Sequence, residues 1–367
     1  SGQWYIENGQ RSLANNSVAY TEMPDTGAFL REWTSLYESK SGERGIFNRQ
    51  AAKDMVPERR DNSYEFGVNP CSEILLRPRE FCNLSEVVCR PDDTLATIRK
   101  KVTQATWIGT IQSTLTDFRY LSAPWKRNTE EERLLGVSLT GIMDCPAILK
   151  ASDKELQGLR DHARKENISA AKLLGIPESA AITCVKPSGT VSQLVDSASG
   201  IHARHNPHYV RTVRADKKDP LAKMMHDQGF PCEDDVTKPD HTWVFSFPVK
   251  GPKDGIYRKD MSAVEQLELW KVYQENWCEH KPSITVSVKE EEWMGVGAWV
   301  YDNFEYMSGV SFLPFADHSY RQAPYQDCSK LEYQKLLKEM PKDSDWSKLI
   351  EYEEKDMTHG SQELACS

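Results

Sequence analysis

An amide, a thiol and a carboxylate stand at alternate positions of one short stretch, at Asn69, Cys71 and Glu73. Pro70 fixes one backbone torsion and pushes the residue before it towards an extended conformation. Because alternate residues of an extended segment point to the same side, we expect these three side chains to face one small volume. A second thiol, Cys82, follows on a predicted strand.

Such a group of side chains is suited to radical chemistry on a sugar. A thiol that loses its hydrogen atom becomes a thiyl radical, which can take hydrogen from carbon. A carboxylate can take the proton of a neighbouring hydroxyl, and an amide can hold that hydroxyl in place. A further thiol pair can supply two electrons by forming a disulfide. The ordinary alternative is that each cysteine is a small buried apolar residue.

A resemblance favours the chemical interpretation. The stretch resembles the finger loop and the following strand of ribonucleotide reductase large subunits, and the resemblance covers nearly the whole chain. It is carried by two motifs, Val68-Asn69-Pro70-Cys71-Ser72-Glu73-Ile74 and Phe81-Cys82-Asn83-Leu84-Ser85-Glu86.

The resemblance assigns a role to each of these residues. It implies that Cys71 carries the thiyl radical and that Glu73 is the base at the sugar 3′-hydroxyl. It also implies that Asn69 is the hydrogen-bonding amide and that Cys82 is one of two reducing thiols. The implied fold is α/β, the C-terminal portion of a ten-stranded α/β barrel with a central finger loop.

Composition limits the class of protein. The chain has 367 residues, and its ten Trp, fourteen Tyr and eleven Phe suffice for a sizeable core. The net charge of −9 indicates no nucleic-acid surface, and no apolar run approaches the roughly 18 residues of a membrane span. The nine cysteines form no close pairs of the metal-site type. We therefore expect a cytoplasmic protein with free thiols and with neither nucleic acid nor a membrane as a partner.

Apolar periodicity predicts helices that alternate with strands. This order favours parallel pairing in an α/β architecture. The stretch 134–141 is small and apolar, and suits close packing or a turn into a helix. Helices are predicted at 25–39, 95–118, 153–174 and 290–306 and between the capping box at Ser262 and Pro282, and strands at 3–7, 18–20, 46–48, 182–185, 284–288 and 309–313.

A Ser/Gly/Thr turn follows the predicted strand at 182–185 directly. Backbone N–H groups and hydroxyls at such a turn attract a phosphate, although a simple helix cap gives the same pattern. The reductase family places the substrate's phosphates on a Pro-Ser-x-Thr turn at this point. The resemblance therefore implies four substrate-binding residues, Ser188, Gly189, Thr190 and Val191.

Two further polar segments have weaker signals. In the reductase family, a polar loop between two early strands reads the bound base, which makes Gln10 and Arg11 candidates for that role. The alternative is an ordinary surface turn. The histidines at 202, 205 and 208 are irregularly spaced and lack the further ligands that a zinc site needs, so no metal site is predicted.

The chain is expected to divide into a catalytic barrel at 1–325, incomplete at its N-terminus, and a tail at 326–367. Family members re-reduce the active-site disulfide with a C-terminal thiol pair, and Cys366 matches the first thiol of that pair. The implied reductant is an external dithiol such as thioredoxin.

The second active-site thiol is expected on an early strand, before the point where this sequence begins. Cys89, Cys145 and Cys184 are the stand-ins within the chain, and none has the expected sequence context. The chain is therefore expected to be a fragment, or one piece of a split protein that needs an N-terminal complementing chain.

The source of the radical is inferred by elimination. Members that import it from a metal-containing partner use two adjacent tyrosines where this chain has Phe312-Leu313, and the glycyl-radical signature is missing. Together with the segments 312–314 and 320–325, this resembles the adenosylcobalamin-dependent class II ribonucleoside-triphosphate reductases.

The sequence leaves three functions to distinguish. The first is radical reduction of ribonucleoside di- or triphosphates to 2′-deoxyribonucleotides through Cys71. The second is a non-catalytic nucleotide-binding fragment of a split reductase, complemented by an N-terminal partner. The third is a different radical enzyme acting on a non-nucleotide substrate, which the phosphate turn at 188–191 disfavours.

Overall fold

The structure is a computed structural model that describes residues 15–40, 42, 44–315 and 321–353. The chain divides into two compact units, one formed by 1–204 and 254–315 and the other by 205–253 and 316–367. The first unit holds every described residue of the predicted site.

Seven strands of the first unit form one continuous order, and β3 and β4 form a separate hairpin. β5, β6 and β7 are mutually parallel, β11 is parallel to β12, and a parallel bridge from Val185 to Pro282 connects the two sets. β12 then pairs antiparallel with β2, and β2 pairs parallel with β1. The five strands β5-β6-β7-β11-β12 thus run in one direction, and the adjoining strands β2 and β1 run in the opposite direction. The bounds are β1 (Val18–Tyr20), β2 (Gly45–Asn48), β5 (Asn83–Val88), β6 (Leu135–Thr140), β7 (Thr183–Cys184), β11 (Thr285–Val288) and β12 (Gly309–Pro314).

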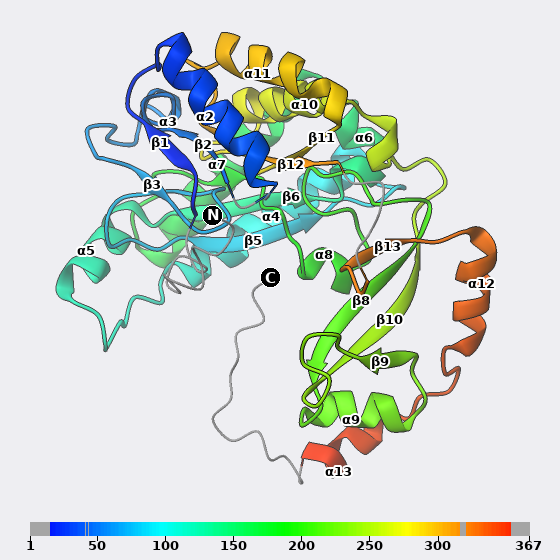
Figure 1. The fold of residues 1–367 in the computed structure, drawn as a ribbon. Helices are drawn as coiled ribbons and strands as arrows, with labels where there is room; N and C mark the ends of the chain where they lie inside the picture. The colour runs from blue at the N-terminus through cyan, green and yellow to red at the C-terminus, as the bar shows by residue number, and fades with distance from the viewer. Residues whose placement is uncertain (1–14, 41, 43, 316–320, 354–367) are drawn as a thin grey trace. The chain divides into compact units, whose positions relative to one another are not determined.

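Helices follow these strands in the same order. α4 packs on β5 and β6 and against α7, α7 contacts α10, α10 contacts β11 and α11, and α11 contacts α2. Figure 1 shows α2, α10 and α11 together on one side of β11 and β12. Helices outside a parallel run of strands confirm the predicted α/β class. The helices are α2 (Thr26–Ser39), α3 (Arg49–Met55), α4 (Leu95–Gln112), α5 (Ala123–Glu132), α6 (Pro146–Leu149), α7 (Asp153–Leu174), α8 (Val191–Leu194), α10 (Ala263–Asn276) and α11 (Trp293–Asp302).

Local signals determine several helix ends. α7 has the predicted bounds: a capping box joins Ser152 to Glu155, and Gly175 ends the helix with a φ of 68°. α10 begins at the predicted capping box of Ser262 and Glu265. Short polar side chains that satisfy backbone groups at helix ends are thus readable from sequence.

Several expectations need correction. The helix expected from Ser262 to Pro282 ends at Asn276, and the helix expected at 290–306 spans 293–302. The stretch 134–141 holds the fully buried strand β6, because a central parallel strand is covered on both faces and reads as a continuous apolar run. The long helix ends at Gln112 and not at 118. The hydroxyls of Ser113 and Thr114 donate to the carbonyls of Thr110 and Ile111, at 2.6 and 2.7 Å, and so take the place of further helical bonds.

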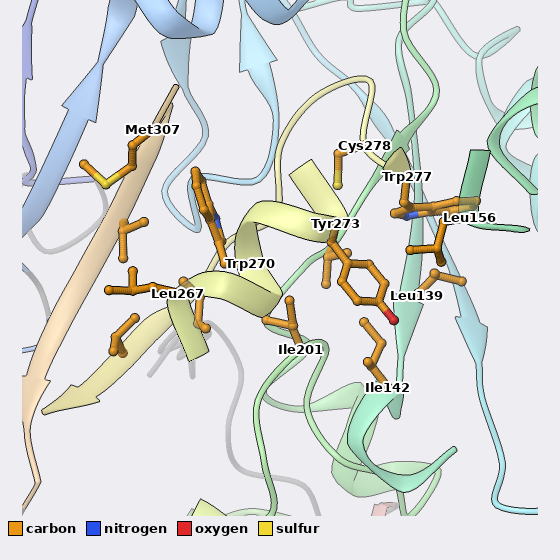
Figure 2. Close-up of a cluster of buried hydrophobic side chains, with 14 of the residues drawn as sticks. Leu139, Ile142, Leu156, Ile201, Leu267, Trp270, Tyr273, Trp277, Cys278 and Met307 are labelled. Atoms are coloured by element: carbon orange, nitrogen blue, oxygen red, sulfur yellow. The ribbon is translucent and has the colours of Figure 1, made fainter. Parts of the chain in front are cut away.

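The core of the first unit lies between the strands and the helices, and α10 contributes its largest side chains. Trp270, Tyr273 and Trp277 are each at most 1% exposed. Figure 2 shows Trp270 and Tyr273 projecting from α10, with Leu139 and Ile142 near the tyrosine ring. The polar atoms of the three aromatics donate to backbone carbonyls, and Trp277 Nε1 reaches Cys184 O at 2.8 Å. The core therefore fixes the strand end that borders the site.

The second unit is an antiparallel sheet with its own small core. Its order is β13-β8-β10-β9, and Phe230 and Phe245 are buried in that core. The expected division after residue 325 falls within β13, which pairs with β8. The elements are β8 (His208–Asp216), α9 (Pro220–Asp227), β9 (Cys232–Asp234), β10 (Thr242–Lys250), β13 (Tyr325–Asp327), α12 (Lys330–Glu339) and α13 (Leu349–Glu353).

A buried ionic cluster holds the hairpin formed by β3 (Gly67–Val68) and β4 (Leu75–Leu76). Arg60 donates to Leu75 O at 3.0 Å and to Glu132 at 2.8 Å. Arg77, which follows β4, donates from its backbone N to Glu80 at 2.8 Å. The four ionisable side chains are 0–7% exposed, so the hairpin is tied to an ionic cluster screened from water.

The two carboxyl groups of this cluster differ in charge. Burial, together with a hydrogen bond to Glu132, raises the pKa of Glu80 to about 8. Burial also acts to raise the pKa of Glu132, but the bonds from Arg60 and Glu80 outweigh it and the pKa is lowered. At neutral pH Glu80 therefore carries the proton, and Glu132 is the anion that the two arginines face.

We expect Glu132→Gln to lower the free energy of unfolding by about 3–5 kcal/mol, because it leaves buried arginine charge uncompensated. Glu80→Gln keeps a neutral group of the same shape and is expected to cost less than about 1.5 kcal/mol.

The stability of the wild type is also expected to depend on pH. Because the pKa of Glu80 in the folded protein lies above the ordinary 4.5, the free energy of unfolding of the wild type falls as pH rises from about 4.5 to about 8. The Glu80→Gln variant lacks this fall. Urea unfolding across this pH range checks both expectations, and equal losses in the two variants would contradict them.

A second prediction concerns the close approach of Gly200 to Lys186. Gly200 has a φ of 55°, and a Cβ there would stand 2.2 Å from the backbone oxygen of Lys186. We expect Gly200→Ala to cost about 2 kcal/mol or more, since backbone cannot move aside cheaply. Gly158 of α7 has nothing within 4 Å of a built Cβ. Gly158→Ala is the matched control and is expected to gain up to about 1 kcal/mol in the same unfolding measurement.

Candidate active site

The residues 69–74, here called the finger loop, connect β3 to β4 through a tight turn. Ser72 N donates to Asn69 O at 2.8 Å, and Ile74 N donates to Asn69 Oδ1 at 3.0 Å. The φ of Ser72 is 67°, in the left-handed region. The loop is therefore not extended throughout, and the expected alternation of side chains does not hold across Ser72.

As a result of this turn, the thiol and the carboxylate differ in their exposure to solvent. Cys71 is exposed at the loop, whereas Glu73 is fully buried. Asn69 Oδ1 is occupied by the loop's own backbone, and its Nδ2 group takes no part in that bond. The three predicted side chains thus share one loop but occupy different surroundings.

Lys186 joins the finger loop to the neighbouring turn. Its Nζ lies 3.2 Å from Glu73 Oε1, while Glu73 Oε2 is buried without a hydrogen-bond partner among the described residues. Burial acts to lower the pKa of Lys186, but the electrostatic influence of Glu73 and then of Cys71 outweighs it, so the pKa is raised. The lysine therefore stays cationic beside the buried carboxylate.

The turn after β7 begins two residues beyond this lysine. Ser188 is 3% exposed, has a φ of 50°, and its Oγ has no hydrogen-bond partner in the described part of the chain. No atom of the described residues lies within 4 Å of where a Cβ on Gly189 would stand. Val191 begins α8, which has only four residues. The structure therefore brings the predicted phosphate turn and the finger loop to the same lysine.

Cys82 directly precedes β5 and lies within electrostatic reach of Glu73. Burial, and then the charge of Glu73, raises the pKa of Cys82 to about 12. The thiol is protonated at neutral pH, which suits a donor of hydrogen atoms and disfavours a thiolate nucleophile.

None of the three stand-in thiols lies where it can bridge to Cys82. Cys184 on β7 is in register with Glu86 on β5, and β6 lies between these two strands, which are therefore roughly 10 Å apart. Cys82 lies four residues before Glu86 in the chain, which adds to its separation from Cys184. Cys89 lies seven residues along from Cys82, or roughly 23 Å of extended chain, and Cys145 is its neighbour. A disulfide needs Cα atoms within about 7 Å.

Two lysines of the site were not predicted from the sequence. Lys186 stands next to the Pro-Ser motif, and that adjacency is its only signal. Lys281 lies in the irregular segment before β11 and carries no pattern at all. Its Nζ donates to Ser72 O at 2.5 Å and to Ser72 Oγ at 3.0 Å.

The remaining candidates lie elsewhere. Gln10, Arg11 and Cys366 fall outside the described residues. His202 is a satisfied core residue: its ring bonds Ser199 O at 3.1 Å and accepts from Thr285 N at 3.0 Å.

Metal-binding and membrane-spanning features are both absent from the part of the chain that the structure describes. There, no group of three or more His, Cys, Asp or Glu side chains is arranged to hold a metal ion. No helix of that part has the length and apolar character needed to cross a membrane.

Comparison with known proteins gives a consistent relationship. The chain is 27% identical over 321 residues to the adenosylcobalamin-dependent ribonucleoside-triphosphate reductase of Euglena gracilis, covering 83% of this chain and 42% of that protein. It is 25% identical over 367 residues to the protein of the same name from Lactobacillus gasseri, covering 89% and 48%. The chain thus spans about half the length of the curated relatives it matches. No protein-family model matches it.

Two solved structures share the fold. A B-12 dependent (class II) ribonucleotide reductase superposes with a TM-score of 0.74 at 22% identity, covering 97% of this chain and 54% of that one. The alpha subunit of the Actinobacillus ureae class Id ribonucleotide reductase gives a TM-score of 0.55 at 14% identity, covering 82% and 64%. The chain is therefore a homologue, over most of its own length, of adenosylcobalamin-dependent ribonucleoside-triphosphate reductases, and it has the fold of a class II ribonucleotide reductase.

Proposed function

We propose that this chain is the catalytic part of a ribonucleotide reductase, which converts ribonucleoside di- or triphosphates to 2′-deoxyribonucleotides through a thiyl radical on Cys71. One observation carries the proposal: the buried carboxylate of Glu73, two residues after the exposed Cys71, pairs with Lys186, which leads into the turn at Ser188. This ion pair connects the finger loop to the proposed phosphate turn, which supports a shared site.

Each residue of the finger loop has a role that its surroundings support. Cys71, as a thiyl radical, takes the hydrogen atom from the sugar, because it is the exposed cysteine among the described residues. Glu73 takes the proton of the 3′-hydroxyl, and its buried Oε2 has no competing partner among the described residues. Asn69 holds that hydroxyl through its Nδ2 group. Cys82 supplies a hydrogen atom from its protonated thiol and is half of the reducing pair.

The substrate is held mainly at its phosphates. Ser188, Gly189, Thr190 and Val191 form the phosphate turn, with the buried Ser188 hydroxyl available to donate. Two non-glycine residues in left-handed conformation, Ser72 and Ser188, lie in the two segments of the site. Strain at both segments supports a functional reason for their shapes. Gln10 and Arg11 read the base.

The cofactor is proposed to be adenosylcobalamin, as in the names of the relatives. The residues present fit it: Cys71 is exposed and accessible to a bulky group, and the strand β12 carries Phe312-Leu313 near its end, which offers no phenol to relay a radical. When bound, this cofactor supplies the oxidising equivalent that removes a hydrogen atom from a thiol. The chain's part is to keep the Cys71 thiol reduced and presented at the loop.

The proposed partners follow from the thiols. A dithiol protein such as thioredoxin, acting through Cys366, returns the reducing pair to its thiol form. No disulfide joins any two cysteines of the described residues, which supports a reducing, cytoplasmic location. The barrel of ten strands, the catalytic region at 1–325 and the redox tail at 326–367 remain part of this proposal.

The deciding experiment measures deoxynucleotide formation with adenosylcobalamin, a dithiol and each ribonucleotide in turn. We expect Cys71→Ala to lower product formation by about 1,000-fold or more, because no other exposed thiol stands at the finger loop. Nucleotide binding should change less than about twofold, since the phosphate turn is intact. Cys232→Ser, at a thiol of the second unit, is the matched control. Product formation by the Cys71→Ala variant at the wild-type rate would refute the mechanism.

A second function is favoured by the coverage of relatives, which is about half of their length. Here the chain binds nucleotide but is catalytic only together with a chain that supplies the missing reducing thiol. It predicts no product from this chain alone, and product when an N-terminal complementing chain is added. Product from the isolated chain would exclude this alternative.

Binding provides a separate prediction for the phosphate turn. We expect Ser188→Ala to raise the Kd for ribonucleotide about tenfold, the value of a lost hydrogen bond to a charged oxygen. Ser192→Ala is the control: that hydroxyl bonds Ser199 at 2.8 Å instead of facing a ligand. Equilibrium titration with a fluorescent nucleotide measures both. Equal affinities for the Ser188→Ala variant and the wild type would remove Ser188 from the site.

A further inference from the structure

We infer that Lys281 is a positioning residue for Cys71, which fixes the finger loop through the peptide that follows the thiol. The inference rests on the proposed role of Cys71. Lys281 lies between α10 and β11, in a segment that runs parallel to the end of β7 through the bridge from Val185 to Pro282. The residue is 1% exposed.

Three hydrogen bonds connect this one lysine to the two residues after Cys71. Its backbone N donates to Glu73 O at 3.3 Å. Its Nζ donates to Ser72 O at 2.5 Å and to Ser72 Oγ at 3.0 Å. Ser72 has the left-handed φ of 67°, which an L-residue adopts only at an energetic cost. The lysine therefore stabilises the peptide whose conformation directs the neighbouring thiol.

The second lysine of the site has a different task. Lys186 neutralises Glu73 directly, at 3.2 Å. Within the described residues, Lys281 forms no ion pair, and its ammonium group is used on a carbonyl and a hydroxyl. A buried ammonium without a carboxylate is expensive to maintain unless its hydrogen bonds serve a purpose. Gly309 makes room for it, since a Cβ there would stand 3.3 Å from Lys281 Cε.

The charge of Lys281 is sensitive to pH near neutrality. Burial lowers its pKa to about 8, against the opposing influence of Glu73 on the finger loop, Cys278 on its own segment and Cys184 on β7. A neutral amine is a weaker donor than an ammonium group. The support for Ser72 O therefore weakens as pH rises through about 8, and the finger loop loosens in the same range.

Hydrogen exchange measures this directly, without reliance on turnover. The amides of Ser72 and Ile74 are bonded within the loop, so their protection reports its order. We expect Lys281→Met to speed exchange of a peptide spanning 68–76 at least tenfold, while the peptide of β5 stays within twofold of wild type. Lys271→Met, which removes a lysine that bonds Asn303 at 3.1 Å, is the matched control and should leave both peptides unchanged.

Kinetics then separates positioning from binding. In the Lys281→Met variant, kcat for deoxynucleotide formation should fall at least tenfold with KM unchanged, because the phosphate turn does not depend on Ser72. Exchange of 68–76 at the wild-type rate in the folded Lys281→Met variant would overturn the inference. If Cys71→Ala retained activity, the proposed function would fail, while the exchange result would still decide whether Lys281 orders the loop.

A variant that does not fold leaves a second measurement on the wild-type chain. After correction for the intrinsic pH dependence of exchange, the peptide 68–76 should lose protection as pH rises through about 8, and the β5 peptide should not. A flat corrected profile for 68–76 would overturn the inference independently of any substitution.

Discussion

The site depends on a buried carboxylate that is paired with a lysine at one oxygen only. Glu73 is completely inaccessible to water, and Lys186 lies 3.2 Å from its Oε1. Burying an unpaired carboxylate costs too much free energy for a folded protein. The ion pair with Lys186 is therefore what allows this carboxylate to be kept away from water. The neighbouring residues serve this arrangement: Lys186 leads into the Ser188 turn, and Lys281 holds the loop through Ser72.

The surrounding fold makes that arrangement possible by bringing strand ends together. Lys186 follows β7 and Lys281 precedes β11, and these neighbours are connected by a parallel bridge. The hairpin that carries the finger loop is tied at its base by Arg60 and Glu132. Two buried charge clusters, one at each end of the hairpin, thus leave the loop few ways to move.

Sequence patterns predicted many of the regular elements because short-range signals determine them. The capping box at Ser262 and the glycine after α7 marked helix ends to the residue. β6 was misjudged because a strand buried on both faces loses the alternation that identifies strands. The left-handed Ser72 could not be predicted, since nothing in its type demands that conformation and its support comes from Lys281, 209 residues away in the chain.

Sequence analysis predicted only those site residues that lie within recognisable motifs. Cys71, Glu73 and Ser188 lie in motifs, and the ion pair of Glu73 with Lys186 connects the two segments that hold them. Long-range partners such as Lys281 are brought to the site by the tertiary fold, and no local sequence pattern identifies them. The expected disulfide partner of Cys82 was likewise not found among Cys89, Cys145 and Cys184, because strand register keeps them too far apart.

The exposure of Cys71 has a chemical consequence for the protein's survival. Burial raises the pKa of the thiols of Cys82, Cys89, Cys184 and Cys278, which makes them poor targets for peroxides and electrophiles. The exposed sulfur at the finger loop has no such shelter. Among the described cysteines, oxidative damage is therefore directed first to Cys71, and air-free handling protects that thiol more than the buried ones.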